Sequence, residues 1–502
     1  MGPNEKSRPD DVKVLGAETG TATSGSLHDA PASAIEDDNK ALESRVTRKI
    51  DMRVVPMLCA LYLTAYLDRT NIGNARLLGL EAELKMPSDG YNTAIWVFFL
   101  TFPLRTSSML IILQVPSNLV MARSKIPPHW WLGISMTLLG IVTMCQGFVR
   151  SPAPLYVCRA IMGIFEGSLG PAAALMMGSY YRKHEFPLRY CCFTTSALVG
   201  ASFSSFLAYA ISFMDDVQGI SAWRWIFILE GLFNIVVALF TFVVLPPFPA
   251  ESTFLAPEEK QHLLDRLYRE RGDEADTLRG QPWMSFLFDW QTWLNIVMYF
   301  GADMSAAAIS QFSPTILNEL GWTANEANLR NVPIWLVGAF FAVTANILAG
   351  RLKIRFPFIL FGATLCTIGW AIQLSQANPS GVRYFALYFI ATGAFIQLPM
   401  CVAWLSANLV GRPRKAVAHA LQIGFGNSAN FVSANVFITT QRPKYPTGFT
   451  TGLVITVVGL VAASVLEYTL WTKNKQADRR EAKGEPETKL VGKDGVRFRY
   501  TL

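Results

Sequence analysis

Ionisable side chains inside long apolar stretches are the part of this sequence most able to do chemistry. Seven such residues occur: Asp68, Arg69, Arg105, Arg159, Glu166, Glu230 and Asp303. A charged group is costly inside a bilayer, so each of these residues is a candidate functional residue. A carboxyl group beside an arginine in such a medium can change between its protonated and ionised forms near neutral pH. The pattern predicts anion binding and proton exchange within a membrane.

Four of these residues are expected to lie together. Asp68 and Arg69 lie about 24 Å along the first apolar helix, and Arg159, on a helix of opposite direction, reaches nearly the same depth. This predicts an ion pair between Asp68 and Arg159. Glu166 lies one heptad beyond Arg159, on nearly the same helix face and about 10 Å deeper. The alternative is that the arginines extend to the outer interface and Glu166 only hydrogen-bonds neighbouring helices.

The other candidates are more widely spaced. Glu230 follows Trp223-Arg224-Trp225, so we expect it to anchor a helix end, with a role at the substrate as the alternative. Asp303 is expected near mid-membrane in the second half of the chain, where it either binds substrate or only joins helices. Polar residues that could line a cavity there, or serve as contacts between helices, are Tyr299, Gln311, Gln397, Asn427 and Asn430.

Twelve apolar stretches must position these side chains. Hydrophobic residues make up 51% of the 502-residue chain and charged residues 16%, and the charges lie mainly between the stretches. A helix needs roughly 20 apolar residues to cross a bilayer. The sequence therefore predicts an all-α membrane protein with twelve transmembrane helices, at residues 52–72, 91–121, 130–149, 153–180, 189–213, 223–246, 292–316, 331–350, 356–376, 383–408, 416–439 and 447–471.

The connections suggest both an orientation and a division of the chain. Alternate connections are rich in lysine and arginine and the others in acidic residues, which places the basic connections and both termini in the cytosol. Similar segments, RSKIPP from Arg123 and RLKIRFP from Arg351, follow the second and eighth helices and indicate two parallel halves. We expect a disordered tail at 1–51, six helices at 52–246, a cytosolic linker at 247–291 containing a surface helix at 256–271, six helices at 292–471 and a disordered tail at 472–502.

Other kinds of function find little support in the sequence. The five histidines are scattered, and the seven cysteines lie in apolar stretches without the spacing of a metal or redox site. No nucleotide-binding loop or catalytic triad motif appears in a suitable context. The net charge of +7 is spread over the connections, unlike a nucleic-acid-binding surface. We expect no metal, no cofactor, no nucleic-acid partner and no enzymatic activity.

Five motifs carry a resemblance to a known family. They are LDRTNIGNARLLGLEAEL from Leu67, QVPSNL from Gln114, RAIMGIFEGSLGP from Arg159, WRWIFILEG from Trp223 and RKAVAHALQIGFGN from Arg414. Together they resemble the fungal allantoate permease group of the major facilitator superfamily, within the anion:cation symporters. The resemblance covers residues 45–470. It implies twelve helices in two halves, alternating access and proton-coupled movement of small carboxylates such as vitamins or allantoate.

The resemblance also implies roles for particular residues. Asp68 and Glu166 would couple protons, and Arg69 and Arg159 would bind substrate. The glycine-proline motif of antiporters is not evident in the fifth helix, which favours symport. Three features depart from the family pattern: no acidic residue follows the second helix, Gly350 stands where an aspartate is common, and the second helix is about eight residues longer, with Pro103 and Arg105 at membrane depth.

These observations predict a secondary active transporter of the plasma membrane, monomeric, that moves a small organic anion with protons. The first alternative is an exporter of a fungal secondary metabolite or organic acid. The second is a receptor that keeps a transporter fold without transporting. Substrate identity does not follow from the sequence.

Overall fold

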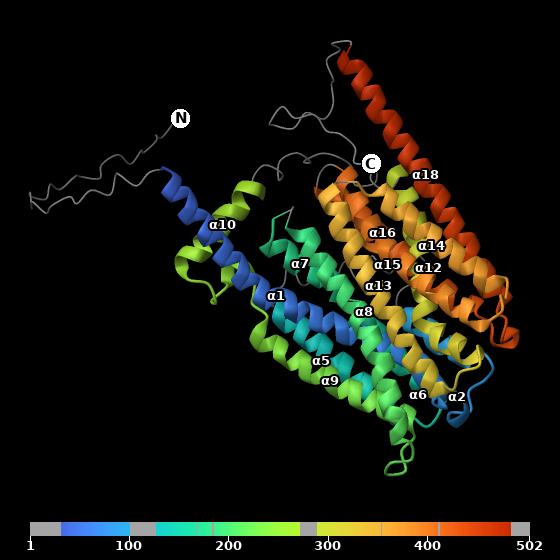
Figure 1. The fold of residues 1–502 in the computed structure, drawn as a ribbon. Helices are drawn as coiled ribbons and strands as arrows, with labels where there is room; N and C mark the ends of the chain where they lie inside the picture. The colour runs from blue at the N-terminus through green and yellow to red at the C-terminus, as the bar shows by residue number, and fades with distance from the viewer. Residues whose placement is uncertain are drawn as a thin grey trace, which may run out of the picture. The chain divides into compact units, whose positions relative to one another are not determined.

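The computed structural model describes residues 32–100, 127–167, 169–182, 185–271, 289–352, 354–409 and 412–482, and these are helical almost throughout (Figure 1). The described part contains no β-strand, only an isolated bridge between Val217 and Ile220. Met1–Arg45 and Val46–Leu502 are separate compact units. All contacts reported below lie within the second unit.

Each of the twelve expected spans contains helix in the described residues, which confirms the all-α class and the helix count. The helices are α1 (Ala32–Leu77), α3 (Gly90–Leu100), α5 (Pro128–Gln146), α6 (Pro152–Glu166), α7 (Leu169–Tyr180), α8 (Phe186–Ile211), α9 (Ala222–Val244), α12 (Trp290–Glu319), α13 (Ala324–Leu352), α14 (Phe356–Leu374), α15 (Ser380–Asn408), α16 (Arg412–Asn427), α17 (Ala429–Val436) and α18 (Pro446–Ala482). Seven described helices are long and apolar enough to cross a membrane by length and composition.

Several bounds differ from the expected ones. Helix α1 begins at Ala32 and α18 ends at Ala482, so both continue into segments that the sequence predicts to be tails. The expected fourth helix is divided into α6 and α7, and the eleventh into α16 and α17. At the second division, the Ser428 amide bonds the carbonyl of Phe425, three residues back, which tightens the chain and interrupts the α-helix. The rest of the second expected helix, residues 101–121 with Pro103 and Arg105, lies outside the described residues.

Short helices occupy the connections. Helix α2 (Leu80–Glu83) follows α1, and α10 (Pro257–Arg271) is the surface helix expected in the linker. Helix α10 is held by ion pairs: Lys49 Nζ lies 2.7 Å from Glu259 Oε1, and Arg266 Nη2 lies 3.1 Å from Glu185 Oε2. Single 3₁₀ turns lie at Ser212–Met214, Pro249–Glu251 and Thr439–Gln441.

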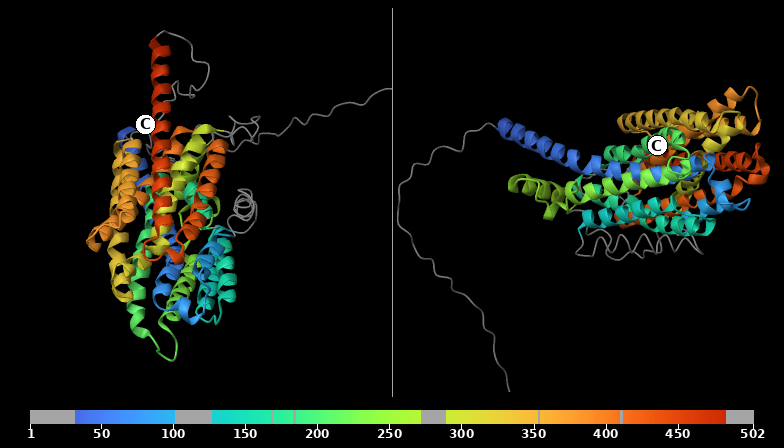
Figure 2. Two further views of the ribbon diagram at one scale, coloured as in Figure 1. Left: turned by 90° about the vertical axis from the view of Figure 1, so that its right-hand side faces the viewer. Right: turned by 90° about the horizontal axis from the view of Figure 1, so that it is seen from below.

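The helices pack as two neighbouring groups, which we call the first group (α1–α9) and the second group (α12–α18). Helix α5 packs on α9 and α3 on α6, whereas α14 packs on α15 and α12 on α18. Between the groups, α8 packs on α13 and α3 on α17. In Figures 1 and 2 the blue to green helices accordingly lie beside the yellow to red ones.

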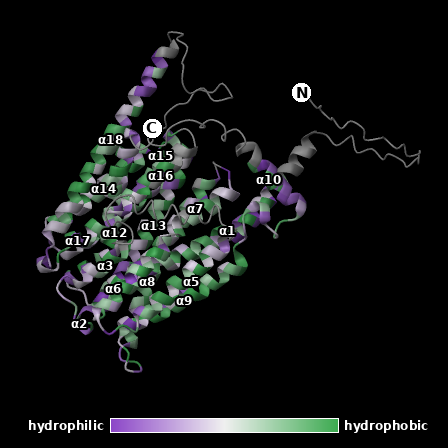
Figure 3. Cartoon of the chain, turned by 180° about the vertical axis from the view of Figure 1, so that it is seen from behind, coloured by the Kyte–Doolittle hydropathy of each residue, from purple (hydrophilic) through white to green (hydrophobic). Residues whose placement is uncertain are grey.

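The outer faces of the helices are apolar. Val243, Phe340 and Tyr468 expose 85%, 65% and 65% of their surface. Hydrophobic residues run along α5, α9 and α18, whereas hydrophilic residues lie on α10 and at the C-terminal end of α18 (Figure 3). Arg159, Glu166 and Asp68 are buried instead. This reversal of the usual arrangement in water is the one a lipid solvent favours.

The two groups are joined by polar contacts at the end of the bundle formed by α2 and the segment 437–445, which we call the predicted outer end. Arg442 of the second group lies 3.7 Å from Glu81 Oε2 of the first and 3.5 Å from Glu319 Oε1 of its own group. Nearby, Asn92 Nδ2 donates to the carbonyl of Phe437 at 3.1 Å. These contacts hold α2 and α3 against α12 and α17.

We predict that Arg442→Gln loosens the predicted outer end. Loss of a partly exposed ion pair changes stability by at most about 1 kcal/mol, or about fivefold in the ratio of open to closed molecules. A single cysteine at Ser310, in a variant without the natural cysteines, should react up to about fivefold faster with a membrane-impermeant maleimide. Lys444→Gln, which removes the same charge two residues away, is the matched control. Equal labelling rates for the two variants would contradict the role of Arg442.

Candidate functional site

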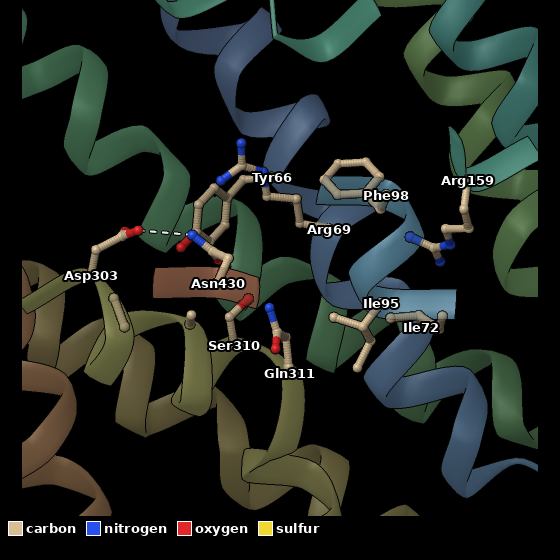
Figure 4. Close-up of a pocket in the computed structure, with 12 residues that line it drawn as sticks. Tyr66, Arg69, Ile72, Ile95, Phe98, Arg159, Asp303, Ser310, Gln311 and Asn430 are labelled. Atoms are coloured by element: carbon tan, nitrogen blue, oxygen red, sulfur yellow. Dashed lines mark hydrogen bonds between the residues drawn. The ribbon is translucent and has the colours of Figure 1, made fainter. Parts of the chain in front are cut away.

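A cavity lies between the two helix groups, with about 440 Å³ of empty volume that includes its opening to solvent. Its wall from the first group contains Tyr66, Arg69, Ile72, Ile95, Phe98 and Arg159, and that from the second group contains Asp303, Ala306, Ala307, Ser310, Gln311 and Asn430 (Figure 4). The α1 residues recur every third position and the α12 residues every third or fourth. Each set therefore occupies one helix face.

Arg69 and Glu166 form an ion pair between α1 and α6, with Arg69 Nε donating to Glu166 Oε1. The Glu166 side chain is 3% exposed. The Arg69 guanidinium also lies over the ring of Tyr66, 5.7 Å from its centroid. Glu166 is thus the partner of the helix 1 arginine, a pairing that the sequence did not predict.

Arg159 is deeply buried and incompletely paired. It is 2% exposed, and its Nη1 donates to the main-chain carbonyl of Asp68 at 3.3 Å. Among the described residues, its Nε and Nη2 have no hydrogen-bond partner. Arg159 and Asp68 are thus in contact, but the predicted ion pair between their side chains is absent from the described contacts. The Asp68 carboxylate instead accepts a hydrogen bond from Asn234 Nδ2 at 2.9 Å.

Across the cavity, Asp303 projects from α12. Its Oδ2 accepts a hydrogen bond from Asn430 Nδ2 at 2.8 Å, drawn as a dashed line in Figure 4. Asn430 also donates to the main-chain carbonyl of Asn427 at 3.2 Å. Asn430 lies directly after the division between α16 and α17, so the interrupted helix places this amide at the cavity wall.

Two of the residues predicted to bind substrate, Gln397 and Asn427, lie away from the cavity lining, as do the predicted proton-coupling residues Asp68 and Glu166. Gln397 donates to the carbonyl of Gly393 on its own helix at 3.0 Å. It is 5% exposed and lies where α15 packs on α14. Asn427 contributes its main-chain carbonyl to Asn430, as described above. Tyr299, also considered from the sequence, packs on Gly426, where an added Cβ would lie 2.1 Å from its ring.

Residues 58–465 match the profile of the Major Facilitator Superfamily. The chain belongs to this superfamily. It is 30% identical over 466 residues to "MFS transporter prlL" of a fungal species, covering 90% of each chain. It is 29% identical to the high-affinity nicotinic acid transporter of Saccharomyces cerevisiae over 459 residues, covering 90% of this chain and 83% of that protein.

A solved structure gives the same fold. The proton:xylose symporter XylE bound to 6-bromo-6-deoxy-D-glucose superposes with a TM-score of 0.63 at 14% identity, covering 83% of this chain and 96% of that chain. The protein is therefore a multi-pass membrane transporter with the major facilitator fold.

This facilitator also contains a buried polar cluster behind α1, which we call the rear cluster: Asp68, Asn71, Asn74, Ser204, Glu230 and Asn234. Asn74 Nδ2 donates to Ser204 Oγ at 3.0 Å, and Ser204 Oγ donates to Asn71 Oδ1 at 2.9 Å. Asp68, Asn71 and Asn74 recur every third residue, on the opposite side of α1 from Tyr66, Arg69 and Ile72. That spacing in the sequence could have indicated a second polar face, which our prediction missed.

Glu230 belongs to this cluster and not to a helix end. It is 1% exposed, and in the described structure neither of its carboxylate oxygens has a hydrogen-bond partner. It lies one helical turn before Asn234, the residue that holds Asp68. The expected anchoring of the α9 end is instead carried out by Arg224, whose Nη1 donates to the carbonyls of Gly147 and Val149 at 2.9 and 2.7 Å.

Other residues of the connections fasten the facilitator's first group. Glu83 accepts hydrogen bonds from Ser221 and Trp223 and pairs with Arg224 at 2.9 Å. Burial acts to raise the pKa of Glu83, but these hydrogen bonds outweigh it and hold the pKa below its ordinary value. The described residues contain no group of three or more His, Cys, Asp and Glu side chains that could hold a metal ion.

We predict that Asn234→Ala lowers the free energy of unfolding by about 1 kcal/mol or more, because it removes the donor to a buried carboxylate. Thermal unfolding of the purified transporter in detergent measures the loss. Asn346→Ala is the matched control, since Asn346 donates only within its own helix, to the carbonyl of Ala342. If the two variants lose the same stability, the contact with Asp68 contributes nothing specific.

Proposed function

We propose that this transporter moves a small organic anion, a carboxylate of the vitamin or allantoate class, by proton symport with alternating access. The single observation that carries the proposal is the Arg159 guanidinium. It lines the cavity, is 2% exposed, and has two nitrogen atoms without a partner among the described residues. A buried unpaired guanidinium is costly, and a carboxylate that accepts from two of its nitrogens would offset that cost.

Charge compensation favours Arg159 over Arg69 as the main anion ligand. Arg69 is already paired with Glu166, whereas the nearest described contact of Arg159 is a neutral carbonyl. An incoming anion therefore gains more binding free energy from Arg159 than from Arg69. Arg69 would contribute a second positive charge on the same wall of the cavity. Asp303 and Asn430 complete the proposed substrate-binding set from the second group.

For proton coupling we propose Glu166 and Asp68. Protonation of Glu166 would remove the negative charge that holds Arg69, so proton uptake would change the electrostatics of the cavity wall directly. Asp68 would act from the other side of α1, through Arg159, which bonds its main-chain carbonyl. The proton and the anion would then act on one connected set of charges.

One relative supports the proposed substrate class. The nicotinic acid transporter, 29% identical to this chain, is named for a small carboxylic acid. We propose that the protein acts in the plasma membrane and, from its motifs, that it belongs to the allantoate permease group of the anion:cation symporters. A cavity lined by both helix groups suits alternation between two halves, which we place at 52–246 and 292–471, joined by a cytosolic linker at 247–291. Both termini would be cytosolic, and the transporter would act as a monomer.

Arg159→Lys should raise the KM for carboxylate uptake at least tenfold, because lysine cannot form the bidentate contact of a guanidinium. The assay is uptake of radiolabelled carboxylates, beginning with nicotinate, by cells expressing the full chain. Arg150→Lys, at an exposed position outside the cavity, is the matched control. Wild-type affinity in Arg159→Lys would overturn the assignment of the anion site.

Glu166→Gln should abolish accumulation driven by an inward proton gradient and keep part of the exchange of labelled for unlabelled substrate, since glutamine resembles the permanently protonated acid. Glu467→Gln is the matched control, because Glu467 lies in α18 and does not line the cavity. Both activities are measured in proteoliposomes with imposed pH gradients. Normal gradient-driven accumulation by Glu166→Gln would show that the coupling residue lies elsewhere.

A further inference from the structure

The cavity has two chemically different ends. One is formed by Arg159 of the first helix group, and the other by Asp303 of the second, and both residues line the cavity (Figure 4). Figure 4 shows the two side chains on opposite sides of the space, with Tyr66 and Phe98 between them. A ligand that spans the cavity therefore meets a cation at one end and a carboxylate at the other.

Among the described residues, the other charged side chains near the cavity are either paired within the protein or lie off the cavity lining. Glu166 pairs with Arg69, and Asn234 bonds the Asp68 carboxylate on the rear side of α1. Asn430 bonds Asp303, but it is a neutral donor and leaves the charge of the carboxylate in place. Of the described charged residues that line the cavity, Arg159 and Asp303 are thus the two outside the printed ion pair, and a ligand can best satisfy these two.

Asp303 cannot serve the same ligand group as Arg159. An ionised carboxylate only accepts hydrogen bonds, and it repels a second carboxylate. Its natural partner is an N–H donor, either cationic or neutral. Ser310 and Gln311 follow Asp303 along the same face of α12 and add polar contacts at this wall. Between the two ends, Tyr66, Ile72, Ile95 and Phe98 offer rings and apolar surface.

We propose that the substrate carries two groups: a carboxylate bound by Arg159, and an N–H donor such as an ammonium, a protonated ring nitrogen, an amide or a ureido group, bound by Asp303. The inference rests on the proposed anion transport and adds the second recognition element. Because the two residues belong to different helix groups, such a substrate bridges the groups. A carboxylate without the donor contacts the first group alone.

Matched pairs of probe molecules test the proposal on the full-length purified transporter. The pairs are pentanoate with 5-aminopentanoate, benzoate with 4-(aminomethyl)benzoate, and butanoate with 4-ureidobutanoate. Binding is measured by isothermal titration at one pH near 6.5. We expect the donor-bearing member of at least one pair to bind about tenfold more tightly, the factor that corresponds to one additional charged hydrogen bond.

The variants assign this preference to Asp303. Asp303→Asn should reduce the preference to about threefold or less and change the affinity of the donor-free member little. Asn430→Ala keeps the carboxylate but removes its positioning donor, so it should give an intermediate preference and serves if Asp303→Asn does not fold. Glu467→Gln is the control, because it also removes one negative charge but outside the cavity lining. It should retain the full preference. Unfolding temperatures without ligand check that each variant is folded.

Four results would overturn the proposal or the anion transport on which it rests. If the wild type binds both members of every pair equally, or the preference survives in both Asp303→Asn and Asn430→Ala, Asp303 does not recognise a donor, and the anion proposal stands alone. If amines that match the probes but lack the carboxylate bind, and no carboxylate binds, the proposed anion transport fails. This inference then fails with it. Both the anion proposal and this inference also fail if every carboxylate binds Arg159→Lys as tightly as it binds the wild type.

Discussion

The cost of placing charge in a medium of low polarity governs the centre of this transporter. Arg69 and Glu166 meet this cost by pairing across α1 and α6, and the Asp68 carboxylate meets it through Asn234. Arg159 meets it only in part, because one nitrogen bonds a carbonyl and two have no described partner. Arg159, whose compensation is incomplete, also lines the cavity, which is why we assign it to the anion.

Helix α1 connects the two polar regions because it has two polar faces. One face, with Tyr66 and Arg69, lines the cavity, and the other, with Asp68 and Asn71, faces α8 and α9. Adjacent residues on a helix are separated by about 100°, so Asp68 and Arg69 point to different neighbours. The contact from Arg159 to the Asp68 carbonyl joins the faces. A proton on one side and an anion on the other could therefore influence each other across a single helix.

The predicted outer end contributes a different kind of interaction. Its ion pairs around Arg442 are partly exposed and individually weak, and they join the helix groups at their connections. Contacts of this strength can form and break during transport at modest cost. The pair of Arg69 and Glu166, whose side chains are 22% and 3% exposed, lies within the first group by contrast. It can therefore stay intact when the two groups separate.

Much of the fold followed from the sequence, because crossing a bilayer demands long apolar helices whose positions hydropathy reveals. The same constraint made the charged candidates visible, and Arg69, Arg159, Asp303 and Asn430 do line one cavity. The sequence did not determine which partner each charge would take. Asp68 bonds Asn234 and not the Arg159 side chain, and Glu230 lies in the rear cluster and not at a helix end. Those choices depend on which helix packs against each face of α1, and packing joins residues too distant in the chain for spacing to reveal.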